Sequence, residues 1–191
     1  MRLMLASANV HKRRELARLV VGHEIDELPA GLALPPEDGE TFAANARAKA
    51  HAVATAVGRA VIADDSGIEA AALDGAPGVR SARYAGERAT DTENLDKLIR
   101  EVTPGSALAY VCALAWVDPQ AGEERLFQAR CTGRMAARAR GRCGFGYDPI
   151  FVCDDARPEG LTMAELSDAA KDAISHRGKA ARLLVDFLSG G

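Results

Sequence analysis

The sequence predicts a mixed α/β protein. Short apolar runs with the length of buried strands alternate along the chain with longer segments in which apolar residues recur at helical spacing. The 191 residues, 48% of them hydrophobic and 27% charged, suffice for one sizeable core or for two lobes that share a sheet. Because no internal repeat or low-complexity linker interrupts the pattern, we expect a single domain over residues 1–191.

The first third of the chain predicts three strands and two helices. In segment 11–21, Leu16 and Val20 lie on one helical face. Segment 41–57 also has a helical pattern, and it is followed by Gly58, a residue type that commonly ends helices. An acidic, proline-rich loop lies between these two helices. The expected strands are 2–6, 24–28 and 60–64.

The remainder predicts turns, a long hairpin and further helices. Thr162 and Glu165 have the spacing of a capping box, which marks the start of a helical segment. Pro104 and Gly105 close the helix before the hairpin. The expected elements are short strands and turns in 67–86, a helix at 91–102, hairpin strands at 107–118 and 123–135, and a final helix at 175–188.

Composition excludes several classes of function. The formal net charge is -3 and the pI is about 5.8, whereas nucleic-acid-binding domains are usually clearly basic. We therefore expect no nucleic-acid partner, and a polyanionic ligand must meet a local cluster of positive charge.

Cysteine spacing and hydropathy indicate a cytoplasmic protein. The four cysteines are too widely and irregularly spaced for a zinc knuckle, and we expect free thiols. The apolar N-terminal run is too short for a signal peptide, and no window approaches the ~20 apolar residues of a membrane span. We expect no membrane association. The cysteines are Cys112, Cys131, Cys143 and Cys153.

Two adjacent carboxylates, Asp64 and Asp65, follow an apolar run. Val61 and Ile62 favour a strand, and Asp-Asp-Ser-Gly favours a turn, so we expect the pair where a strand leaves the sheet. Two neighbouring anions suit Mg²⁺, which binds one or two carboxylates beside water and phosphate oxygens. The alternative is that they cap local backbone groups in a turn.

A second polar group lies at the start of the chain, in Ser-Ala-Asn-Val-His-Lys. Here a strand ends and Ser7, Asn9 and Lys12 lead into a helix. Main-chain N–H groups at a helix N-terminus together with a lysine ammonium form an anion site. An ordinary capped helix is the alternative.

The third group lies on the helix predicted at 41–57 and the loop before it. Asn45 and Lys49 are four residues apart and share a face with Phe42, while Glu37 lies in the loop. Lys49 either reaches into a site or extends its stem along an apolar surface.

The fourth group combines Gly-Phe-Gly-Tyr-Asp with a basic segment near the C-terminus. Glycines on both sides of Phe145 let the backbone approach a flat ligand on which the ring can stack. Lys171, His176 and Arg177 supply donors, the last two at the start of the final helix. A buried core phenylalanine and a solvated helix end are the alternatives.

Together these groups resemble the inosine triphosphate pyrophosphatase family, which cleaves purine nucleoside triphosphates with non-standard bases. Any one motif is weak, but the set occurs in order and nearly end to end. The residues that carry the resemblance are Ser7, Asn9 and Lys12; Glu37, Gly39, Thr41 and Phe42; Asn45 and Lys49; and segments 63–67, 75–86, 144–149 and 173–180.

The resemblance implies an elongated mixed β-sheet flanked by helices, with two lobes and a central active-site cleft, in a homodimer. It also implies Mg²⁺-dependent hydrolysis to the nucleoside monophosphate and pyrophosphate. Asp65 corresponds to the catalytic proton acceptor, and Glu37, Asp64 and Asp65 to the metal ligands. The implied substrate-binding residues are Ser7, Ala8, Asn9, Val10, His11, Lys12, Lys49, Ser66, Phe145, Gly146, Tyr147, Asp148, Lys171, His176 and Arg177.

One position departs from the family pattern, because Ala8 stands where the family usually has glycine. If that position needs a positive φ, alanine would cost about 1 kcal/mol. Two other functions remain as alternatives: a Maf-like nucleotide pyrophosphatase with a different base preference, and a non-catalytic nucleotide-binding protein.

Overall fold

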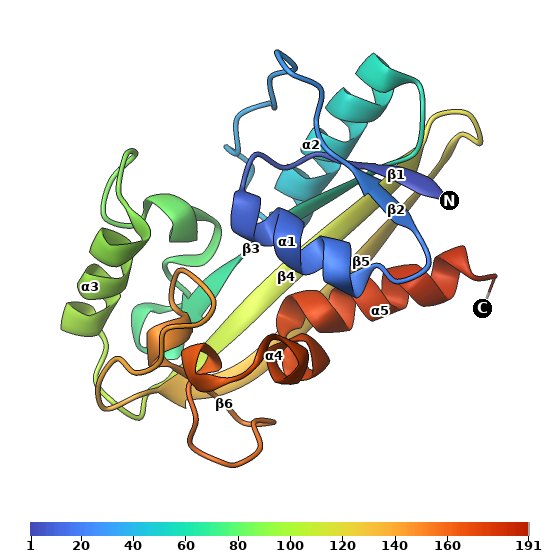
Figure 1. Ribbon diagram of the computed structural model, residues 1–191. Helices are drawn as coiled ribbons and strands as arrows, with labels where there is room; N and C mark the ends of the chain where they lie inside the picture. Colours follow the sequence, from blue (N-terminus) through green and yellow to red (C-terminus); the bar gives the residue numbers. More distant parts are fainter. Residues whose placement is uncertain (191) are drawn as a thin grey trace. The chain divides into compact units, whose positions relative to one another are not determined.

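The computed structural model describes residues 1–190 and contains a six-stranded mixed sheet in the order β2-β1-β3-β4-β5-β6 (Figure 1). Strand β1 pairs in parallel with both β2 and β3, whereas β5 and β6 pair antiparallel. The α/β class predicted from the sequence is confirmed. The strands are β1 (Arg2–Leu5), β2 (Glu24–Asp26), β3 (Val61–Ala70), β4 (Ala107–Asp118), β5 (Glu123–Met135) and β6 (Phe151–Cys153).

The helices begin and end at the residues that cap them. Asn9 accepts hydrogen bonds from the first turn of α1, Thr90 forms a capping box at α3, and Gly58 ends α2 with a φ of 68°. Four short 3₁₀ helices lie between the longer elements. The helices are α1 (Val10–Leu19), α2 (Phe42–Val57), α3 (Asp91–Glu101), α4 (Asp168–Ile174) and α5 (His176–Leu188).

The chain divides into two compact units, and neither is continuous in sequence. Strands β3, β4 and β5 each contribute residues to both. The first unit consists of Met1–Asp65, Cys112–Ala129 and the chain from Arg177 onward, and the second of Ser66–Val111 and Arg130–His176.

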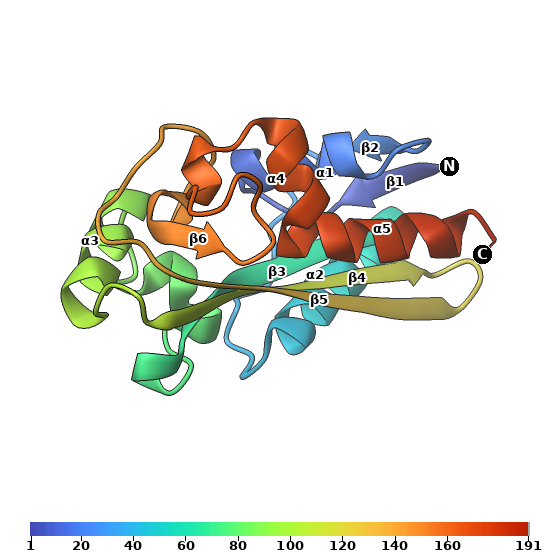
Figure 2. The ribbon, with the colours of Figure 1, turned by 90° about the horizontal axis from the view of Figure 1, so that it is seen from below.

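In the first unit, helices α1 and α5 cover one face of the strands and α2 covers the other (Figure 2). Leu5 and Ile62 from the strands pack with Leu16 of α1 and Leu184 of α5 in one buried cluster. Since successive side chains of a strand point to opposite faces, even-numbered residues of this part of β3 face α1 and α5. Odd-numbered residues face α2.

The second unit has a core of its own. Ile68 of β3, Leu98 of α3, Tyr110 of β4 and Phe151 of β6 belong to one buried cluster. The cluster also includes Met163 from the 3₁₀ turn whose capping box the sequence predicted. The capping box is confirmed, although the segment that it starts is a three-residue 3₁₀ helix.

The predicted turn at Asp64 and Asp65 is wrong. Strand β3 continues through both residues to Ala70, and all ten of its residues are buried or partly buried. Neighbouring cations and an amide donor offset part of the cost of burying the carboxylates. Gly67 is needed because a Cβ atom there would lie 2.3 Å from Ser81 Oγ. Helix α4 was also absent from the prediction.

Within residues 1–190, none of the helices combines the length and the apolar character needed to cross a membrane.

Candidate active site

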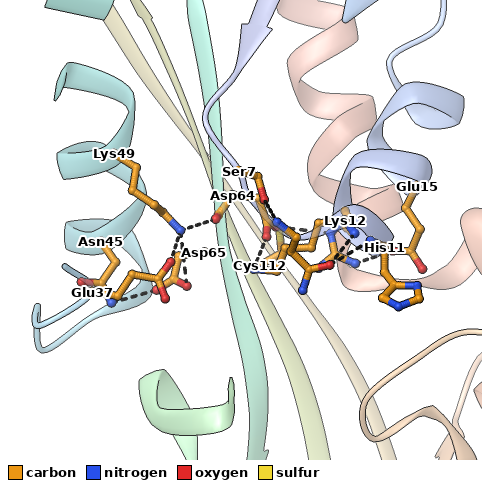
Figure 3. Close-up of polar contacts among 12 residues, drawn as sticks. Ser7, His11, Lys12, Glu15, Glu37, Asn45, Lys49, Asp64, Asp65 and Cys112 are labelled. Atoms are coloured by element: carbon orange, nitrogen blue, oxygen red, sulfur yellow. Dashed lines mark hydrogen bonds and ion pairs between the residues drawn. The ribbon is translucent and has the colours of Figure 1, made fainter. Parts of the chain in front are cut away.

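The two adjacent aspartates lie in different surroundings because they point to opposite faces of β3 (Figure 3). Asp64 lies on the face covered by α1 and α5, where it contacts Lys12 and Arg177. Asp65 lies on the face covered by α2, where it contacts Asn45 and Lys49. The carboxylates therefore have separate cationic or amide partners.

The Asp64 carboxylate is fully buried and has three donors from the same unit. Lys12 Nζ lies 2.5 Å from Oδ1, Arg177 Nε lies 3.3 Å from Oδ2, and the Cys112 thiol donates to Oδ2 over 3.1 Å. Burial would raise the pKa of Asp64, but the charges of Arg177 and Lys12 hold the pKa well below its usual value. Asp64 is therefore a buried anion.

Arg177 connects Asp64 to Glu15 of α1. Its guanidinium is 2% exposed and donates to the Glu15 carboxylate as well as to Asp64. Burial opposes its charged form, but the two carboxylates raise the pKa of Arg177. The sequence predicts that Arg177 reads the base, and that role stays a prediction beside the two carboxylate contacts seen here. The group of Glu15, Lys12, Asp64 and Arg177 contains two anions and two cations.

The start of α1 has the geometry of a capped helix N-terminus. Asn9 Oδ1 accepts hydrogen bonds from the main-chain N–H groups of His11 and Lys12 at 2.9 and 3.1 Å, and Ser7 Oγ accepts from Asn9 at 3.2 Å. Asp74 is the one non-glycine residue with a positive φ in residues 1–190, so Ala8 does not carry the predicted strain. Residues 8–11, which include Val10, are exposed.

The Asp65 carboxylate is held by α2 and the loop before it. Asn45 donates to Asp65 Oδ2 at 2.9 Å and accepts from Gly39 N–H at 2.8 Å. Lys49 Nζ lies 3.8 Å from Asp65 Oδ1, makes a short hydrogen bond to Glu37, and donates to the main-chain oxygen of Asp64 at 2.6 Å. Lys49 is thus buried at the carboxylates and does not extend along the surface.

The two carboxylates of this group have opposite pKa shifts. Burial would raise the pKa of Glu37, but the charge of Lys49 and its hydrogen bond lower it. Burial raises the pKa of Asp65, and the negative charge of Glu37 adds to this effect, while Lys49 and Lys12 oppose it. Asp65 is therefore better suited to accept a proton than its neighbour on the strand.

The three predicted metal ligands do not converge. Residues 1–190 contain no group of three or more His, Cys, Asp and Glu side chains that could hold a metal ion. Glu37 and Asp65 do lie together, and in that group two carboxylates contact one ammonium, that of Lys49. Such a group fits Mg²⁺, which accepts one or two carboxylates when water and phosphate oxygens complete its shell.

The second unit contains a separate polar group centred on Asp148, which is 2% exposed. Its Oδ2 accepts from Lys171 Nζ at 2.6 Å and from the Phe145 main-chain N–H at 2.8 Å, and its Oδ1 accepts from the Tyr110 hydroxyl at 3.1 Å. Lys171 Nζ lies 5.1 Å from the centre of the Phe145 ring. The structure thus brings together three residues predicted to bind the base.

Of the remaining predicted residues of this unit, His176 contacts the same group through Tyr110, while Tyr147 and Gly146 bond elsewhere. His176 stacks on Tyr110 with ring centres 4.6 Å apart, and Tyr147 donates to the Ser81 oxygen at 2.7 Å. Gly146 has a φ of 60°, and its N–H donates to Asp91. Ser66, the residue after Asp65, is partly exposed.

Sequence reasoning missed Glu15, Tyr110 and Cys112. Glu15 lies one helical turn after Lys12, so a buried ion pair could have been sought there. Tyr110 and Cys112 lie within an apolar strand pattern, which gave no signal of a polar role.

A helix N-terminus, two lysines and neighbouring carboxylates on an α/β fold are features common to proteins that bind phosphate groups together with Mg²⁺. The chain belongs to the Ham1 family, whose model matches residues 3–187. This match confirms the family predicted from the motifs.

Named relatives and solved structures agree with this assignment. A dITP/XTP pyrophosphatase of Cutibacterium acnes is 44% identical over 194 residues, which cover 96% of this chain and 94% of the relative. A dITP/XTP pyrophosphatase of Erwinia tasmaniensis is 43% identical over 197 residues, or 99% and 95% of the two chains. A HAM1 protein structure from Coxiella burnetii is 36% identical with a TM-score of 0.86, and the match covers 100% of both chains.

Proposed function

We propose that this protein is a nucleoside triphosphate pyrophosphatase that hydrolyses purine substrates with non-standard bases, namely ITP, dITP and XTP, to the monophosphate and pyrophosphate. The observation that carries the proposal is the arrangement on β3, where a buried carboxylate with a raised pKa, Asp65, lies beside Lys49 and Glu37. The names of the relatives, dITP/XTP pyrophosphatases, support two of these substrates, dITP and XTP.

Lys12 and Lys49 neutralise the triphosphate. Such a substrate carries close to four negative charges, and a lysine ammonium donates charge-assisted hydrogen bonds to phosphate oxygens. The main-chain N–H groups at the start of α1 add partial positive charge for a phosphate oxygen. Charge neutralisation also stabilises the leaving pyrophosphate.

Asp65 accepts a proton from the attacking water. The water oxygen bonds to the α-phosphorus, the bond from that phosphorus to the oxygen bridging to the β-phosphate breaks, and pyrophosphate leaves. The hydrogen bond that Asn45 donates to Asp65 Oδ2 fixes the orientation of the accepting carboxylate.

Glu37 and Asp65 would hold Mg²⁺, and the bound ion would supply positive charge to the phosphate oxygens. The donor set supports this, because the Glu37 and Asp65 carboxylates both lie at the Lys49 ammonium, and carboxylate oxygens are ligands that Mg²⁺ accepts. Asp64, whose charge is matched by Lys12 and Arg177, orients Lys12 in this scheme.

The polar group of the second unit binds the base. Phe145 supplies a stacking face, and Lys171 donates to the 6-oxo group of hypoxanthine or xanthine. Adenine presents a 6-amino donor instead, and a donor facing a donor leaves buried groups unpaired, which can reject a substrate by ~10⁴-fold. Guanine shares the 6-oxo group, so this contact discriminates against it less.

Two further expectations follow from the family resemblance: a homodimer and a cytoplasmic location. Sedimentation velocity on the purified chain tests the first, with a mass of two chains as the expected result. Fractionation of cells that produce the protein tests the second, with recovery in the cytoplasmic fraction expected.

The decisive experiment measures pyrophosphate release from ITP, XTP, dITP, GTP, ATP and UTP, with Mg²⁺ and with EDTA. We expect rapid release from ITP, XTP and dITP, much slower release from ATP, and loss of release in EDTA. A preference for UTP would favour the Maf-like alternative. Tight ITP binding without release of pyrophosphate in any condition would favour a non-catalytic binding protein.

A further inference from the structure

Tyr110 contacts two residues of the base-binding group in the second unit. It lies in β4 and is 7% exposed, and its hydroxyl donates to Asp148 Oδ1 at 3.1 Å. Its ring stacks on His176 with 4.6 Å between ring centres and an angle of 8° between the planes. Tyr110 therefore links the carboxylate of this group to the imidazole.

The hydroxyl completes the hydrogen bonding of Asp148. Oδ2 already accepts from Lys171 Nζ and from the Phe145 N–H. It therefore holds the Lys171 ammonium and the backbone of Phe145 in place. Gly144 makes this possible, because a Cβ atom there would lie 2.0 Å from Oδ2. Oδ1 accepts from Tyr110, and this second anchor prevents the buried carboxylate from rotating about its last bond.

The ring is itself held in place. Phe151 of β6 lies 4.6 Å from the Tyr110 ring centre at an angle of 40° and belongs to the same buried cluster. A ring fixed on one side by the core gives His176 a rigid surface to stack on. The orientation of His176 thus depends on the shape of the Tyr110 ring, and that of Asp148 depends on its hydroxyl.

We propose that Tyr110 is a positioning residue that sets base recognition, by anchoring Asp148 and through it Lys171 and Phe145. The proposal rests on the proposed function, because it assigns Tyr110 to recognition of the base. It separates two contributions: the hydroxyl sets the affinity for 6-oxo purines, and the ring sets the placement of His176.

The test compares Tyr110→Phe with Tyr84→Phe. Tyr84 is a matched control in the same unit, because its hydroxyl also donates to a carboxylate, that of Glu101, outside the base-binding group. The measurements are kcat and KM for ITP and ATP, calorimetric Kd for IMP, and the inhibition constant of tripolyphosphate. Tripolyphosphate carries the phosphate charges without a base.

For Tyr110→Phe we expect about a tenfold rise in the KM for ITP and the Kd for IMP, the scale of one lost hydrogen bond to a charged group. The kcat for ITP, the KM for ATP and the tripolyphosphate inhibition constant should change by less than about twofold, so the preference for ITP over ATP shrinks. Tyr84→Phe should leave all of these values unchanged. Tyr110→Leu also removes the stacked ring, so it should raise the Kd for IMP further than Tyr110→Phe does.

Two outcomes would overturn the proposal. In the first, Tyr110→Phe and Tyr84→Phe change the Kd for IMP by the same factor. In the second, Tyr110→Phe raises the KM for ITP and the inhibition constant of tripolyphosphate by the same factor. Failure of the proposed function can be told apart from failure of the Tyr110 proposal, because the wild type would then release no pyrophosphate from ITP. In that case IMP binding still tests Tyr110, and wild-type protein that did not bind IMP would overturn both. Thermal unfolding of each variant identifies general damage to the fold.

Discussion

Asp64 and Asp65 are consecutive, yet the structure gives them opposite chemical properties. The alternation of side chains along β3 directs one to Lys12 and Arg177, and the other to Asn45 and Glu37. The pKa of Asp64 is lowered by its cations, and the pKa of Asp65 is raised by burial and by Glu37. Two carboxylates whose pKa values are driven apart commonly have different roles at an active site.

We expect Asp65→Asn to lower kcat for ITP by roughly 10²-fold or more, the scale of a lost general base, while the Kd for the nucleotide and the melting temperature change little. The amide keeps the shape of the side chain and its place beside Asn45 but cannot accept the proton. Steady-state kinetics and calorimetry check this. Turnover within a few-fold of the wild type would remove Asp65 from the role of base.

At this scale, the sequence predicted residue types better than partners. Lys12, Lys49, Asp148 and Lys171 were expected at functional sites, and each contacts another candidate site residue in the structure. Arg177 was assigned to the base, but its partner Glu15 lies 162 positions away in the chain. Local spacing carries no information about such a contact, because only the packing of α5 against α1 creates it.

Strand β3 is the element in which propensity and structure disagree. Asp-Asp-Ser-Gly is typical of turns, yet the strand runs through it. Each carboxylate has partners on its own face of the strand, and the absent Cβ of Gly67 makes room for Ser81. Most other elements follow their local signals: the hairpin strands β4 and β5 and the end of α2 were predicted residue for residue. The seven-residue α4 is too short for a helical period to be recognised.

We expect Gly67→Ala to destabilise the protein by about 1–3 kcal/mol, the usual range for an overpacked core. The added Cβ would lie 2.3 Å from Ser81 Oγ and 2.7 Å from the Gly78 oxygen, which is main chain and cannot rotate away. Gly105→Ala is the control, since its φ of 87° is strained for alanine but no atom lies within 4 Å. Urea unfolding should show the larger loss for Gly67→Ala, and equal losses would contradict the steric explanation.

For the whole molecule, Asp64 links folding to pH. A carboxyl whose pKa is lower in the folded state stabilises the fold above its unfolded pKa, and this contribution is lost as the pH falls through the folded value. We expect Asp64→Asn to be less stable than the wild type at pH 7 by roughly 3–5 kcal/mol, because it leaves Lys12 and Arg177 without their shared anion.

The difference in the free energy of unfolding between the wild type and Asp64→Asn should shrink as the pH falls below about 4. In this range an unperturbed aspartate begins to take up a proton. Urea unfolding of both proteins at pH 7, 4 and 3 measures it. A difference that stayed constant over this range would mean that the charge of Asp64 does not stabilise the fold.

The division of each unit into separate stretches of sequence has a consequence for biosynthesis. Arg177 is translated more than a hundred residues after Asp64, and the first unit needs both. A nascent chain that has not reached the last helix holds an aspartate without its guanidinium partner and a core without Ala180 and Leu184. Translation therefore cannot complete this unit before α5 has been made: its native packing requires that residues 177–188 have left the ribosome.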